Sequence, residues 1–107
     1  MNTSCLASKV IVWCRKFFSI SEDVTINFKI DIHEDPDCWG VCEQTDDKMY
    51  TISVSDDQSL RDFVATIVHE VVHVKQWETG AWDGDGETEA KQLQYAVADR
   101  MWSGGVL

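Results

Sequence analysis

The sequence has few basic residues, a single proline and no long apolar run. Lysine and arginine total 9 residues against 19 aspartates and glutamates, which gives a formal net charge of −10. A surface that follows nucleic-acid phosphates needs clustered positive charge, so a nucleic acid is not expected as a direct ligand. No apolar run approaches the ~20 residues of a membrane-spanning helix, and no signal peptide is recognisable. We therefore expect a soluble, cytoplasmic protein without a membrane partner.

The length and the composition predict one small domain. The chain has 107 residues, of which 44% are hydrophobic and 26% are charged, as in ordinary globular domains with one core. We expect residues 1–107 to form that domain. Its four cysteines, Cys5, Cys14, Cys38 and Cys42, are expected to be thiols because no secretory signal precedes them. A local bridge, or half a metal site, at Cys38 and Cys42 is the alternative.

The spacing of apolar residues predicts the helices. Stripes of helical period indicate helices from Thr3 or Ser4 to about Phe18, from Leu60 to Trp77, and from about Glu87 to Trp102. Ser55, Asp56 or Ser59 is placed to start the second helix, and Gly80 to end it.

Alternation of apolar and polar residues predicts the strands. The pattern is clear in Val24–Ile32 and Met49–Ser55, and a shorter strand is expected in Trp39–Gln44. We predict an α+β fold in which the first helix and a three-stranded, mostly antiparallel sheet pack against the second helix, and the third helix crosses it.

The pattern H-E-x-x-H occupies residues 69–73 within the second predicted helix. Residues four apart on a helix lie one turn apart on the same face, so His69 and His73 are placed to bind one zinc ion with Glu70 beside it. Both histidines lie opposite the apolar arc of this helix, which indicates a cleft. The alternative is two ordinary histidines on the wet face of an amphipathic helix.

A catalytic zinc takes three protein ligands and keeps one position open. Glu87 and Glu89 open the next helix after a glycine-bearing turn, and a helical hairpin would bring that first turn back toward the histidines. We predict Glu89 as the third ligand, with Glu87 as the alternative. Gln76 follows His73 by three positions and is a candidate to brace a ligand.

These residues resemble the gluzincin branch of the zinc metallopeptidases. The resemblance rests on the H-E-x-x-H pattern and on a downstream Glu-Ala pair, here Glu89-Ala90, and covers about residues 49–102. The short chain is similar to the minigluzincins, and small H-E-x-x-H proteins of this kind also occur in phage genomes. The resemblance implies a minimal zincin-like domain in which an exposed strand, 39–44 or 49–55, pairs with the substrate.

The sequence departs from that family at two places. Many gluzincins carry a bracing aspartate four residues after the ligand glutamate, where this chain has Leu93. Larger relatives stabilise the oxyanion from a C-terminal subdomain, for which Tyr50, His33 and Tyr95 are the candidates here. A short apolar tail, residues 102–107, could fold back over the cleft and make the enzyme latent.

Together these features predict a zinc metallopeptidase, an endopeptidase with one Zn2+ per chain and a peptide or protein as substrate. Zinc would activate a water molecule and polarise the scissile carbonyl group, and Glu70 would act as the general base. Two alternatives stay open. The first is a zinc hydrolase of another amide or ester, because the metal does not choose the acyl group. The second is a zinc-stabilised interaction module without catalysis.

Overall fold

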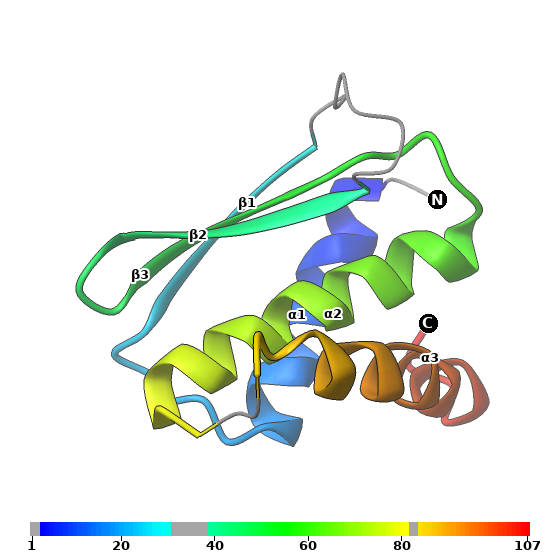
Figure 1. Ribbon diagram of the computed structural model, residues 1–107. Helices are drawn as coiled ribbons and strands as arrows, with labels where there is room; N and C mark the ends of the chain where they lie inside the picture. Colours follow the sequence, from blue (N-terminus) through cyan, green and yellow to red (C-terminus); the bar gives the residue numbers. More distant parts are fainter. Residues whose placement is uncertain (1–2, 31–38, 82–83) are drawn as a thin grey trace.

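The computed structural model describes residues 3–30, 39–81 and 84–107. The elements follow in the order α1 (Thr3–Phe17), β1 (Thr25–Ile30), β2 (Gly40–Asp46), β3 (Met49–Val54), α2 (Leu60–Thr79) and α3 (Glu87–Ser103). In Figure 1, α2 lies between the sheet and α3, and α1 lies behind α2. The described residues therefore form the expected α+β fold.

Helix α2 is the central element of the core, because it contacts α1, α3, β2 and β3. It begins after Ser59, whose side chain accepts a hydrogen bond from the backbone N–H of Asp62 at 3.2 Å. It ends at Gly80, which adopts the left-handed conformation with φ of 68° and donates to the carbonyl of Gln76. These are the capping positions that glycine and serine favour, so the sequence sets both ends of the helix.

The sheet is mixed rather than mostly antiparallel. Its strand order is β1-β3-β2, with β1 parallel to β3 and β2 antiparallel to β3. The expectation of a mostly antiparallel sheet is therefore wrong. Strand β3 takes the centre because it is the most apolar strand, with Tyr50, Ile52 and Val54 fully buried. Strand β2 is polar and largely exposed, and it forms an edge.

The other expectations for the elements hold within a few residues. The first strand was expected to reach Ile32, which lies outside the described residues, as do His33 and Cys38. Cys14 and Cys42 are thiols, and burial raises the pKa of each to about 12. Among the described residues, no helix has both the length and the apolar character needed to cross a membrane.

One polar contact fixes the sheet to α2 from within the core. The hydroxyl of the fully buried Tyr50 donates a hydrogen bond to Glu78, whose other carboxylate oxygen lies 3.4 Å from Lys48 Nζ. The Tyr50 ring also stacks on Trp77 with the ring centroids 5.7 Å apart. Burial, and then the bond to Glu78, raise the pKa of Tyr50 above its ordinary value.

We expect Tyr50→Phe to lower the free energy of unfolding at pH 7 by about 1–2 kcal/mol, because the ring still packs but the hydrogen bond is lost. The pKa of Tyr50 is raised by folding, so its contribution is complete below the unfolded pKa of about 10 and declines as the pH rises above it. Urea unfolding followed by circular dichroism at pH 7, 9 and 10.5 measures this. The parent should lose more stability than Tyr50→Phe between pH 9 and 10.5, and equal losses would contradict the role of the hydroxyl.

Candidate metal centre

His69 and His73 lie one turn apart on α2, with their ring centroids 5.0 Å apart. Their ligand nitrogens and a carboxylate oxygen of Glu70 all lie within 4.8 Å of one another, and this group could hold a metal ion. The histidine side chains are mostly buried, and Glu70 is 5% exposed. The spacing of the pattern therefore produces the converging arrangement that it predicts.

Both imidazole rings are oriented by a glutamine. His69 Nδ1 lies 2.6 Å from the carboxamide oxygen of Gln94 on α3, and His73 Nδ1 lies 2.9 Å from that of Gln76 on α2. An amide oxygen only accepts, so each Nδ1 carries the proton and donates it. In the neutral ring, the lone pair is then on Nε2, which is the nitrogen that a metal ion would bind.

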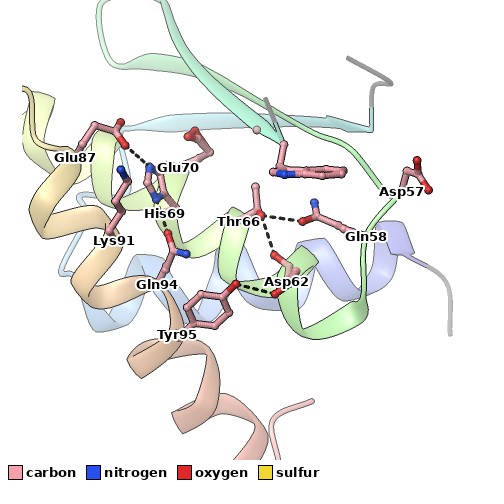
Figure 2. A pocket seen from close by; sticks show the side chains of 12 residues that line it. Asp57, Gln58, Asp62, Thr66, His69, Glu70, Glu87, Lys91, Gln94 and Tyr95 are labelled. Atoms are coloured by element: carbon pink, nitrogen blue, oxygen red, sulfur yellow. Dashed lines mark hydrogen bonds and ion pairs between the residues drawn. The ribbon is translucent and has the colours of Figure 1, made fainter. Parts of the chain in front are cut away.

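The two Nε2 atoms face one carboxylate, that of Glu87. His69 Nε2 lies 3.0 Å from Glu87 Oε2, and His73 Nε2 lies 2.8 Å from Glu87 Oε1. Figure 2 shows Glu87 reaching from α3 toward His69, with Gln94 on the other side of the ring. The alternative third ligand, Glu87, is thus the acid that the fold brings to both histidines.

Glu89, the preferred third ligand from the sequence, lies elsewhere. Its carboxylate accepts a hydrogen bond from Gln76 Nε2 at 3.0 Å and lies 3.4 Å from Lys75 Nζ. The bond from Gln76, followed by the charge of Lys75, lowers the pKa of Glu89. Residues two apart on a helix point about 200° from each other, so only one of Glu87 and Glu89 can face the histidines.

The start of α3 determines which of the two acids does so. Gly86 caps the helix with φ of 79°, and a Cβ there would lie 2.3 Å from Gln76 Oε1. Gln76 also donates to the Gly86 carbonyl at 2.9 Å. A glycine is therefore needed both for the conformation and for the close approach, and the helix begins with Glu87 directly beside the histidines.

Strand β2 covers the other side of Glu70. A Cβ on Gly40 would lie 2.6 Å from Thr66 Cγ2 and 3.3 Å from Glu70 Cγ, so the absence of a side chain lets the strand approach α2. The smaller distance is shorter than any normal contact. Gly40 thus brings the edge strand against the general-base candidate.

Two cavities border this group of residues. The larger, of about 660 Å³, is lined on its inner side by His69, Glu70 and Glu87. The smaller, of about 370 Å³, is lined by His73, Glu70 and Glu87, and also by Cys42. Gly40 of β2 borders both cavities. The candidate ligands are thus open to a groove on either side, as the helical wheel predicts for the histidine face.

The two described candidates for oxyanion stabilisation, Tyr50 and Tyr95, do not point at the ligands. Tyr50 is engaged with Glu78 in the core, and His33 lies outside the described residues. Tyr95 lines the larger cavity, but its hydroxyl donates to Asp62 Oδ1 at 2.7 Å. This bond raises the pKa of Tyr95 and is the main cause that lowers the pKa of Asp62.

The C-terminal tail lies away from both cavities. Val106 and Leu107 pack against the hydrophobic core, and Val106 N donates to the carbonyl of Met101 at 3.0 Å. None of residues 102–107 lines either cavity. The structure therefore gives no support to a tail that blocks the site.

Sequence reasoning missed Gln94 as a brace. The position four residues after Glu89, where many gluzincins carry the brace, holds Leu93, which packs against the core. Counted from Glu87, however, Gln94 is seven residues on, two turns along the same helical face. The seven-residue spacing therefore indicates Gln94 as a brace only if Glu87, and not Glu89, is taken as the third ligand.

Comparisons of the chain with protein-family models, with curated proteins and with solved structures find no match.

The ligand set can be tested with two single variants. We expect Glu87→Ala to weaken zinc binding by at least about 100-fold and Glu89→Ala by less than about 10-fold, since the former removes a contact to both imidazoles and the latter a partner of Gln76. Zinc per chain, measured by elemental analysis during titration with a chelator, gives the affinities. A larger loss in Glu89→Ala than in Glu87→Ala would restore Glu89 as the ligand.

The glutamine braces make a separate prediction. Gln94→Ala and Gln76→Ala should each weaken zinc binding by about 10- to 100-fold, because the imidazole loses the acceptor that fixes its orientation. Gln92→Ala on the exposed face of α3 is the matched control and should bind zinc as the parent does. The same chelator titration measures all three, and parent-like affinity in Gln94→Ala would exclude it as a brace.

Proposed function

We propose that this protein is a zinc-dependent metallopeptidase of the gluzincin type, an endopeptidase in which His69, His73 and Glu87 hold the metal. The observation that carries the proposal is the pair of contacts from one Glu87 carboxylate to both Nε2 atoms, at 3.0 and 2.8 Å. Ligands ~2.0–2.1 Å from a tetrahedral zinc ion lie about 3.3 Å apart. A small outward shift of Glu87 would therefore suit the ion.

The donor set favours zinc over magnesium or calcium. Two imidazole nitrogens and one carboxylate, with a fourth position open to a cavity, are the ligands of a catalytic zinc site, whereas magnesium and calcium take oxygen ligands. The Nδ1 bonds to Gln94 and Gln76 leave the correct ring nitrogen for the ion. Zinc bound there would activate water and polarise a carbonyl group.

In the proposed mechanism Glu70 acts as the general base. It is buried beside the histidines and borders both cavities, so its carboxylate can take a proton from a water molecule that attacks a substrate carbonyl carbon. The same carboxyl group can then return the proton to the leaving nitrogen. Burial behind Gly40 limits the solvent that competes for this carboxylate.

The substrate class is supported by the position of β2. It is an edge strand of the described sheet and borders both cavities through Gly40. An edge strand offers unpaired backbone groups to an extended peptide, and a groove on either side of the metal suits a chain that continues past the cleaved bond. A peptide or protein fits this arrangement better than a small amide or ester.

The mechanism predicts a specific separation of binding from chemistry. We expect Glu70→Gln to keep about one zinc per chain and to cleave unfolded casein about 10²- to 10⁴-fold more slowly, because the amide cannot accept the proton. Glu22→Gln removes the same charge at an exposed position before β1 and should cleave as the parent does. Cleavage by zinc-loaded Glu70→Gln at the parent rate would refute the mechanism. A zinc-loaded parent that cleaves nothing, and that unfolds on chelation, would favour the non-catalytic module.

A further inference from the structure

The larger cavity contains one positive charge beside the candidate ligands. Lys91 is the only lysine or arginine among the described residues that line it, and none lines the smaller cavity. The chain carries 19 acidic residues against 9 basic ones. A lone ammonium group at this position therefore opposes the general charge of the protein.

Lys91 lies on the same face of α3 as the ligand and the brace. It is four residues after Glu87 and three before Gln94, so the three side chains form one row along the helix. In Figure 2 the ammonium end of Lys91 points toward the end of the cavity where Glu87 and His69 lie. The helix that supplies the third ligand thus also supplies a cation next to it.

Three other polar side chains of this cavity are already paired. Thr66 Oγ1 lies 3.1 Å from Gln58 Oε1, Gln94 is bonded to His69, and Tyr95 donates to Asp62. By contrast, no hydrogen bond or ion pair joins Lys91 to another of the described residues. Its three N–H donors are therefore open to whatever occupies the cavity.

We propose that Lys91 donates a hydrogen bond to the carbonyl oxygen of the scissile peptide bond as negative charge develops on it. The proposal rests on the proposed function. Water adds to the carbonyl carbon, its proton passes to Glu70, and the carbonyl π electron pair moves onto the oxygen. When the C–N bond breaks, that pair reforms the carbonyl group and Glu70 gives its proton to the nitrogen. Lys91 keeps its own protons and supplies only charge and a hydrogen bond.

The test uses zinc-loaded protein and two phosphonate dipeptide analogues. In each analogue a tetrahedral anionic phosphorus group replaces the scissile bond. One has a free C-terminal carboxylate and the other a C-terminal amide. Affinities are measured by calorimetry for the parent, Lys91→Met, Lys91→Arg and Lys29→Met. Lys29 is exposed on β1, away from both cavities, so its variant controls for the change in net charge.

We expect Lys91→Met to bind both phosphonates at least about tenfold more weakly than the parent, with Lys91→Arg between them and Lys29→Met unchanged. Loss for the free acid alone would overturn the proposal and assign Lys91 to a terminal carboxylate. Equal affinities in the parent and Lys91→Met would also overturn it. Zinc per chain is measured in each sample to distinguish failure of the proposed function from failure of the role of Lys91. A parent protein without zinc would refute the proposed function itself.

Discussion

The candidate site depends on the contact between the first turn of α3 and the last turn of α2, where Gln76 is 2% exposed. Its carboxamide oxygen lies 2.9 Å from His73 Nδ1, and its nitrogen donates to Gly86 O and Glu89. Both the oxygen and the nitrogen of this buried carboxamide are hydrogen-bonded, so the group cannot rotate by 180° without losing all of these bonds. One side chain therefore fixes the ring of His73 and the position at which α3 begins, and the approach of Glu87 follows from both.

This contact also concentrates negative charge. Glu70 and Glu87 border the same two cavities in a chain whose formal net charge is −10. The positive end of the α3 dipole offsets part of the repulsion, because Glu87 is the first residue of that helix. A divalent cation would offset much more. Since an ion that binds only the folded chain stabilises it, metal binding and folding are expected to be linked here.

The elements and the histidine pair could be predicted because they depend on local spacing. His69 and His73 need only a helix, and Ser59 and Gly80 mark its ends. The choice between Glu87 and Glu89 could not be made in this way, because one residue of uncertainty in a helix start rotates a side chain by about 100°. The prediction of a mostly antiparallel sheet failed because the order of the strands could not be predicted either. Alternation shows which face of a strand is buried, whereas the central place of β3 follows from the total apolar content of all the strands.

The small core is sufficient for such a site because the row of α3 that packs in the core lies beside the row that lines the site. In α3 the buried positions are Ala90, Val97, Ala98 and Met101, and the adjacent row holds Glu87, Lys91 and Gln94. Any change in how the buried row packs on α2 rotates the other row by the same angle. The apolar contacts that hold α3 in place thus also aim the third ligand, the cation and the brace of His69. The residues that stabilise this fold and those that would do its chemistry are therefore constrained together.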